Sequence, residues 1–193
     1  MARAQASLQA DVVIVGAGVA GLATAYHLAL ESSLKIIVLE EEKTLGGHAS
    51  GRNAGMIRQT VSDPFLARMA LLGRQALVRV SKNGWKKIRL LSNGSLLLAK
   101  NGDLEEIKKI KKTTDSLGIS TQWLSQEQAE AKAPLLQGAS FDRALFCPSD
   151  ALLETKPLLE SFFERLKSLK VQVLFSATPK KICASASTIS ARN

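Results

Sequence analysis

The segment 11–40 constrains the fold of this 193-residue chain more than any other part of the sequence. A β-branched apolar run at residues 11–15 precedes three glycines in the spacing G-x-G-x-x-G, and an Ala- and Leu-rich stretch continues to residue 30. A second apolar run follows at residues 35–40. This order predicts a strand buried on both faces, a tight turn, a helix and a second, parallel strand reached by a right-handed crossover.

Each glycine of the motif has a physical task in a dinucleotide-binding turn. Gly16 would allow the tight turn, Gly18 would let a pyrophosphate approach the backbone, and Gly21 would let the helix pack closely on the strand. The N-terminus of the helix that follows would offer free N–H groups and a partial positive charge to the phosphates. Glu40, 19 residues after Gly21, would accept hydrogen bonds from a ribose 2′-hydroxyl and repel a 2′-phosphate. The motif disfavours NADP and leaves FAD and NAD open.

A second glycine-rich segment, residues 44–60, follows the second strand. A plain NAD-binding unit has no need for a long glycine-rich loop at this place. An FAD-binding unit has such a need, because the extended cofactor continues from its pyrophosphate across this loop. The segment therefore favours FAD over NAD.

The chain resembles the FAD-dependent amino-acid and amine oxidoreductases, the family of glycine oxidase, sarcosine oxidase and D-amino-acid dehydrogenase. The resemblance rests on the runs DVVIVGAGVAGLATAYHLA, IIVLEEE and ASGRNAGMI, and continues more loosely through LSQEQAEAKAPLL, ALFCPSDALLE and PLLESFFERLKSL. It covers nearly the whole chain. It implies a flavoprotein that binds FAD and oxidises the CH–NH bond of an amino acid or a secondary amine by hydride transfer to the flavin.

The resemblance also implies a cofactor site in two parts. The ADP half of FAD would be held by Gly16, Ala17, Gly18, Gly21 and Glu40. The pyrophosphate and the flavin ring would be lined by Ser50, Gly51, Arg52, Asn53, Ala54 and Gly55. Arg52 would place a cation near the ring, where it stabilises the reduced flavin. The alternative is a surface arginine that pairs with Glu41 or Glu42.

Family members are considerably longer than this chain, and the resemblance places their substrate-binding residues in a C-terminal half. The chain is therefore expected to be the N-terminal half of an enzyme, and no catalytic residue is assigned. Two functions stay open: an FAD-dependent oxidoreductase with a small amine or amino-acid substrate, or a catalytically incomplete flavin-binding fragment or subunit that needs a partner chain. A plain NAD-dependent dehydrogenase is disfavoured by the second glycine-rich segment. An electron acceptor is a further expected partner.

The expected fold class is α/β, with a Rossmann-like, three-layer parallel sheet for FAD and the start of an antiparallel substrate domain. The FAD-binding domain would be incomplete and would comprise residues 1–90 and 151–193, and the substrate domain would begin at 91–150. Strands of the parallel sheet are expected near residues 11–15, 35–40, 171–175 and 182–190. A helix starting at Asp63-Pro64 is expected to run to about Lys82. Its apolar residues at helical spacing include Phe65, Met69, Leu72, Ala76 and Val80.

Composition argues against several other classes of protein. The net charge is +9, but aromatic residues make up only 5% and basic residues are spread along the chain, so nucleic-acid binding is not expected. Cys147 and Cys183 lack a C-x-x-C motif and paired histidines, which indicates no disulfide framework and no metal site, and fits a cytoplasmic protein. The uncharged run 12–30 contains the motif glycines, so no transmembrane segment is expected.

Overall fold

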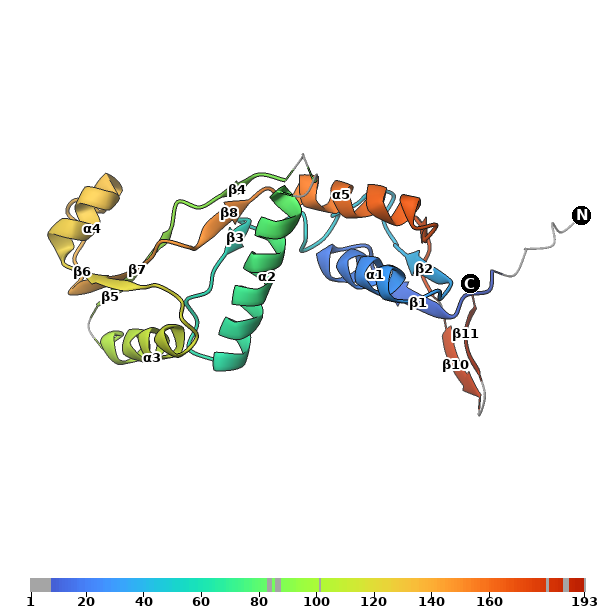
Figure 1. The fold of residues 1–193 in the computed structure, drawn as a ribbon, viewed down its shortest axis with the longest axis horizontal. Coiled ribbons are helices and arrows are strands. Elements are labelled where there is room, and N and C mark those ends of the chain that lie inside the picture. The colour runs from blue at the N-terminus through green and yellow to red at the C-terminus, as the bar shows by residue number, and fades with distance from the viewer. Residues whose placement is uncertain are drawn as a thin grey trace, which may run out of the picture. The chain divides into compact units, whose positions relative to one another are not determined.

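The computed structural model describes residues 8–82, 85, 88–100, 102–179, 181–185 and 188–192, the last two ranges by their backbone alone. The chain divides into two compact units (Figure 1), Met1–Asn53 with Thr155–Asn193, and Ala54–Glu154. The expected boundary at residue 90 lies at residue 53 in the structure. The reason is that strands within 54–91 pair with a strand just before residue 154, and so belong to the second unit.

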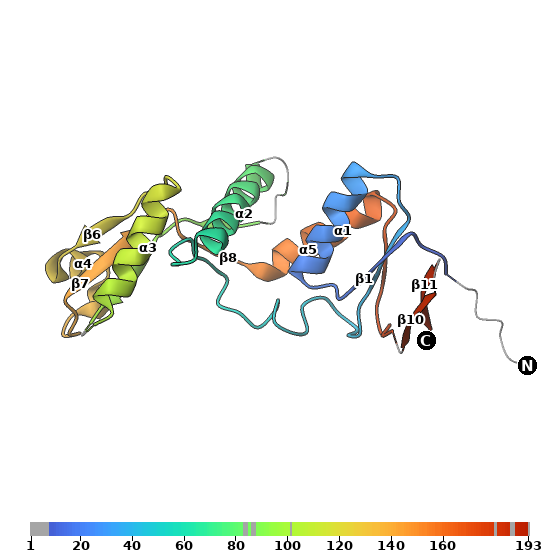
Figure 2. The same ribbon diagram turned by 90° about the horizontal axis from the view of Figure 1, so that it is seen from below.

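The first unit contains a three-stranded parallel sheet and two helices. Its elements are β1 (Val12–Val15), α1 (Val19–Glu31), β2 (Ile36–Leu39), α5 (Thr155–Ser168) and β9 (Gln172–Leu174). The strand order is β1-β2-β9, and both pairs are parallel. Helices α1 and α5 pack against each other (Figure 2), with Leu22, Leu159 and Leu166 fully buried. The predicted strand, glycine turn, helix and parallel strand are confirmed.

Strand β1 differs from the expectation that both of its faces are buried. Val13 and Val15 are exposed, whereas Ile36, Ile37 and Val38 of the neighbouring strand β2 are buried. Among the described residues β1 stands at the edge of its sheet, so one face lacks the cover that a central strand has.

The expectation that residues 182–190 extend the parallel sheet was wrong. The described backbone forms a separate antiparallel pair, β10 (Lys181–Ser185) with β11 (Thr188–Arg192), in which Ser185 lies beside Thr188. Strands separated by two residues can only turn back on themselves, because a parallel pair needs a crossover of a dozen residues or more.

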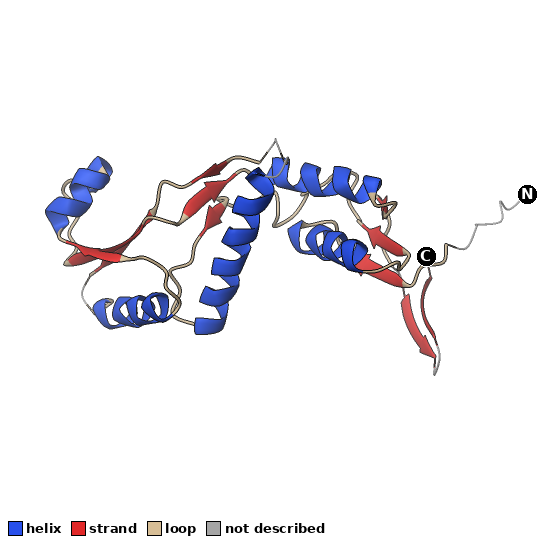
Figure 3. Ribbon diagram, viewed as in Figure 1, coloured by secondary structure: helices blue, strands red, loops and turns tan. Residues whose placement is uncertain are grey.

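Among its described residues, the second unit contains two antiparallel three-stranded sheets, ordered β3-β8-β4 and β5-β7-β6. Figure 3 distinguishes the strands from the helices by colour. Its strands are β3 (Met56–Ile57), β4 (Leu90–Leu91), β5 (Ser95–Ala99), β6 (Gln122–Leu124), β7 (Arg143–Cys147) and β8 (Ala151–Leu153). Its helices are α2 (Pro64–Lys82), α3 (Leu104–Ser116), α4 (Gln126–Lys132) and the 3-10 turn η1 (Pro134–Leu136). In β7, Leu145 packs with Ile107 and Ile110 of α3, and Ala144 packs with Ala129 of α4. Successive side chains of a strand point to opposite faces, so α3 and α4 cover opposite faces of this sheet.

The bounds of α2 agree with the predicted helix, but three of its apolar residues at helical spacing are exposed. Phe65, Met69 and Leu72 are 70%, 55% and 51% exposed, whereas Ala67 is fully buried. On the packed side, Arg74 Nε donates to the carbonyl of Ser149. The contacts of α2 with α3 and β4 set its orientation, and they turn the apolar stripe away from the unit.

This orientation predicts opposite outcomes for two neighbouring substitutions in α2. Met69→Ser should change the free energy of unfolding by less than about 0.5 kcal/mol, because Met69 is exposed. Ala67→Leu should lower it by about 1–3 kcal/mol, because the larger side chain overpacks a filled site. Urea unfolding followed by circular dichroism measures both. A larger loss for Met69→Ser than for Ala67→Leu would contradict the orientation of the helix.

Among the described residues, none of the helices combines the length and the apolar composition that crossing a bilayer requires.

Candidate cofactor site

The glycine turn joins β1 to α1 in a form that requires glycine at positions 16 and 21. Gly16 has a φ of +98°, and its N–H donates to the Leu39 carbonyl at 2.7 Å, which ties the turn to β2. Gly18 is the N-cap of α1 and supplies no side-chain cap, so the first N–H groups of the helix are left to other partners. A Cβ on Gly21 would lie 2.0 Å from the Gly16 carbonyl oxygen. Helix and strand therefore approach more closely than any side chain at position 21 would permit.

The buried carboxylate of Glu40 lies beneath this turn. Its Oε2 accepts a hydrogen bond from the Ala17 N–H at 2.7 Å, and its Oε1 accepts one from the Glu42 N–H at 3.0 Å. Glu40 thus links the turn after β1 to the residues that leave β2. Each carboxylate oxygen can accept a further hydrogen bond, so ribose hydroxyls could still be accommodated.

The glycine-rich loop reaches the start of α1 through Ser50. Ser50 Oγ accepts a hydrogen bond from the Val19 N–H at 3.1 Å, across 31 residues of sequence. A Cβ on Gly18 would lie 2.9 Å from the same hydroxyl oxygen. The structure therefore brings Gly16, Ala17, Gly18, Gly21, Glu40 and Ser50 together around the N-terminus of α1. The contact of the Val19 N–H with Ser50 was not predicted, because the G-x-G-x-x-G motif identifies its glycines and not the residues between them.

The loop is shaped by its own backbone. A Cβ on Gly51 would lie 2.0 Å from the Gly46 carbonyl oxygen, so the two glycines pass each other closely. Asn53 Nδ2 donates to the carbonyls of Ala49 and Ser50, at 3.1 and 2.8 Å. These bonds hold the backbone around Ser50 in place.

The remaining predicted residues, Arg52, Ala54 and Gly55, are not part of this cluster. The Arg52 side chain is exposed, and Ala54 and Gly55 begin the second unit. Gly55 has a φ of +63°, and its Cβ would lie 2.2 Å from the Leu153 carbonyl oxygen. It therefore fits only as glycine, because of its contact with β8.

His48 lies beside Glu41 and Glu42, the two carboxylates that the sequence offered as partners for Arg52. Its Nε2 lies 3.1 Å from Glu41 Oε1 and 2.9 Å from Glu42 Oε1. Among the described residues, Arg52 makes no such ion pair. The three side chains of the His48 cluster are about half exposed, so their contribution to stability is small. The possible ligand atoms of these three side chains lie within 4.8 Å of one another, an arrangement that exposed acidic groups commonly show without a metal ion.

Cys147 is a buried, free thiol in β7. Burial, and to a smaller extent the nearby Asp150 carboxylate, raises its pKa, against the opposing effect of a hydrogen bond with Ser149. A thiol held in its neutral form is a poor nucleophile, which argues against a catalytic role. The other cysteine, Cys183, lies in β10, where side chains are outside the described part of the chain.

The donors of the first unit fit the ADP half of a dinucleotide. The N-terminus of α1 offers N–H groups and a partial positive charge to an anion, and Gly18 leaves open the space that a Cβ would fill. The sequence profile of the DAO family, described as FAD dependent oxidoreductase, matches residues 11–188. The chain belongs to the DAO family of FAD-dependent oxidoreductases.

Curated relatives of the chain agree with its assignment to the DAO family. The chain is 28% identical over 127 residues to sarcosine oxidase subunit beta of Rhodobacter capsulatus, which covers 65% of this chain and 31% of the relative. It is 29% identical over 181 residues to the mitochondrial L-2-hydroxyglutarate dehydrogenase of Homo sapiens, which covers 89% of this chain and 37% of the relative. The chain therefore spans less than half the length of these two curated relatives.

A solved structure supports the fold of this DAO-family chain. Glycine oxidase from Geobacillus kaustophilus superposes with a TM-score of 0.82 at 23% identity, covering 96% of this chain and 51% of the enzyme. The predicted resemblance to FAD-dependent amino-acid and amine oxidoreductases is confirmed. The fold class and the FAD dependence of the family are confirmed with it.

Proposed function

We propose that this chain binds FAD and forms part of an oxidoreductase that oxidises the CH–NH bond of an amino acid or a secondary amine. The observation that carries the proposal is the arrangement around the N-terminus of α1. There, the first N–H groups of the helix, the buried Glu40 carboxylate and the Ser50 hydroxyl meet beside a glycine that leaves room for a phosphate.

Each residue has a role in this proposal. The N–H groups of the first turn of α1 that Ser50 does not occupy would bind the pyrophosphate, and Glu40 would accept a hydrogen bond from the ribose. Ser50 and Gly51 would line the pyrophosphate as well, and Arg52 would offer positive charge to the flavin end of the cofactor. When bound, FAD would supply the redox chemistry as the acceptor of a hydride. The protein residues orient the cofactor and balance its charge.

The names of the relatives bear on the substrate class. Sarcosine oxidase and glycine oxidase are named for amines, and L-2-hydroxyglutarate dehydrogenase is named for a hydroxy acid. The name of the sarcosine oxidase subunit supports an amine substrate for the present chain. A cytoplasmic location stays a prediction from the cysteine content.

A second candidate function is a catalytically incomplete FAD-binding chain that needs a partner polypeptide. It is favoured by a relative that is itself one subunit of an enzyme. In this case the partner would supply the groups that bind the substrate.

The experiment that tests the proposal is a visible absorption spectrum of the purified chain after addition of FAD and gel filtration. We expect a flavin band that stays with the protein and that is lost in Gly18→Val, because the new side chain would crowd Ser50 Oγ. Gly73→Ala is a control, since nothing lies within 4 Å of a Cβ at that position. A wild-type chain that never retains FAD would contradict cofactor binding by this chain alone. Turnover of sarcosine or glycine by the isolated chain would discard the second candidate.

A further inference from the structure

Asp150 is a fully buried carboxylate in the second unit that the proposed cofactor site does not use. Its Oδ1 accepts hydrogen bonds from the Gln59 N–H at 2.9 Å and from Gln59 Nε2 at 3.1 Å. Its Oδ2 accepts from Thr60 Oγ1 at 3.2 Å and from Ser95 Oγ at 2.6 Å. Four donors from two distant segments therefore converge on one side chain.

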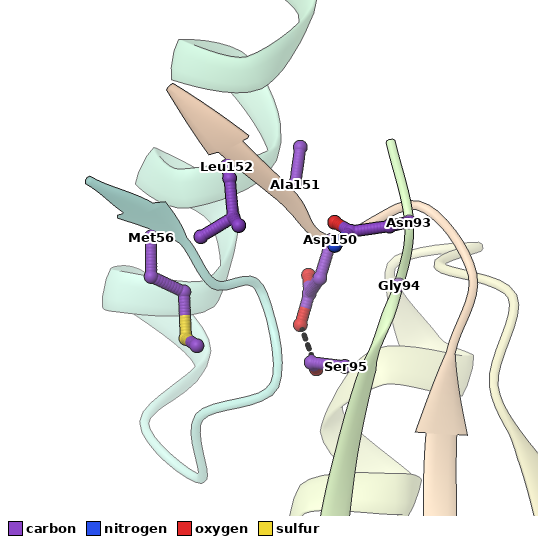
Figure 4. Close-up of a pocket in the computed structure, with 7 residues that line it drawn as sticks. All are labelled: Met56, Asn93, Gly94, Ser95, Asp150, Ala151 and Leu152. Atoms are coloured by element: carbon purple, nitrogen blue, oxygen red, sulfur yellow. Dashed lines mark hydrogen bonds between the residues drawn. The ribbon is translucent and has the colours of Figure 1, made fainter. Parts of the chain in front are cut away.

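The small cavity beside Asp150 does not make this carboxylate a ligand site. Figure 4 shows the side chain directed toward Ser95, with Met56 and Leu152 on another side of the cavity. The cavity measures about 100 Å³, which is room for a few water molecules. A carboxylate has about four acceptor positions, and protein donors take four of them here. A bound amine would find little acceptor capacity left on Asp150.

The position of Asp150 in the chain explains what its hydrogen bonds achieve. It directly precedes β8, which pairs with β3 through Met56 beside Leu152, and the Leu153 N–H donates to the Gly55 carbonyl at 2.8 Å. The Asp150 side chain continues this contact beyond β3 by binding Gln59. Residues 55–60 are thus held to one short stretch of chain along their whole length.

The same residue also reaches the other sheet of the unit. Ser95 begins β5, and the Gly94 N–H donates to the Asp150 backbone carbonyl at 3.0 Å. The side chain and the backbone of Asp150 therefore join the sheet β3-β8-β4 to the sheet β5-β7-β6. Loss of its carboxylate would leave the donors of Gln59, Thr60 and Ser95 without their acceptor.

We propose that Asp150 is a positioning residue that fixes the exit of the glycine-rich loop, residues 55–60, against the start of β5. The inference rests on the proposed function in one respect: residues 50–55 are taken to line FAD, so their exit must be held for FAD to bind well. The carboxylate itself contacts neither cofactor nor substrate. It acts through the backbone that it orders.

Hydrogen–deuterium exchange of the chain without cofactor tests the positioning directly. In Asp150→Ala, we expect exchange at residues 55–60 and 94–96 to be at least about tenfold faster than in wild type. Asp150→Asn should keep most of the protection, because its amide oxygen can accept from Gln59 while the Thr60 and Ser95 hydroxyls turn to accept from its NH₂ group. Thr114→Val is the matched control, as it removes the hydrogen bonds of a fully buried hydroxyl elsewhere in the unit.

An FAD titration followed by flavin fluorescence tests whether the Asp150 hydrogen bonds affect cofactor binding. We expect the Kd of Asp150→Ala to rise at least about tenfold, with Asp150→Asn and Thr114→Val close to wild type. Unchanged exchange at residues 55–60 in Asp150→Ala, or an equal increase in Thr114→Val, would overturn the positioning role. Faster exchange with an unchanged Kd would overturn the connection to FAD. A wild-type chain that does not bind FAD would refute the proposed function, and the exchange data would still decide the role of Asp150.

Discussion

Gly21→Ala is expected to lower the free energy of unfolding by about 3–5 kcal/mol and to abolish FAD retention. The added Cβ would lie 2.0 Å from the Gly16 carbonyl oxygen and 3.4 Å from Ile14 Cγ2. Gly16 cannot easily move, because its N–H is bonded to the Leu39 carbonyl across the sheet. Helix α1 would have to shift away from β1. The better helix propensity of alanine, about 1 kcal/mol, is too small to offset this clash.

A matched control for this substitution exists in the other unit. Gly73 also lies within a helix, α2, but nothing lies within 4 Å of a Cβ at that position. Gly73→Ala should therefore raise the free energy of unfolding by about 0.5–1 kcal/mol. Urea unfolding followed by circular dichroism gives both values. A Gly21→Ala chain as stable as wild type would show that helix and strand are not in the close contact described.

Glu40→Gln is expected to lower the free energy of unfolding by about 1–3 kcal/mol and to weaken FAD binding at least about tenfold. The glutamine has nearly the same size, but its amide carries only one acceptor oxygen. Ala17 and Glu42 donate to different oxygens of the carboxylate, so one of these N–H groups would face the NH₂ group in either orientation. The side chain at position 40 would keep only one of its two hydrogen bonds to the backbone. It would also lose the negative charge that favours a hydrogen bond from a ribose hydroxyl.

The neighbouring Glu41 gives the control for charge alone. Its side chain is exposed and pairs with His48, so Glu41→Gln should change the free energy of unfolding by less than about 0.5 kcal/mol. FAD affinity, measured by fluorescence titration, should remain near the wild-type value. Equal losses of affinity in both variants would mean that only the net charge of the region matters, and that the hydrogen bonds of Glu40 do not.

Local features of the sequence identify some elements and leave others open. A capping box, with Ser125 bonded to Gln128, begins α4 as its sequence indicates. The hairpin of β10 and β11 was missed because residues 186–187 are Ala-Ser, which lack the Asn-Gly or Asp-Gly signal of a tight turn. The exposed stripe of α2 was missed because helical periodicity identifies an apolar face without showing what covers it.

By itself, the sequence determined the order of strand, glycine turn, helix and strand, and the place of Glu40 at the end of β2. These follow from short-range requirements: close approach at glycine, helical and strand periodicity, and a fixed spacing within one βαβ unit. Only the tertiary structure decided that Ser50 meets Val19 across 31 residues, and that Asp150 meets Gln59 across 91. Such bonds depend on how whole elements pack, because a hydroxyl or a carboxylate can serve many donors and only the fold brings one donor within reach.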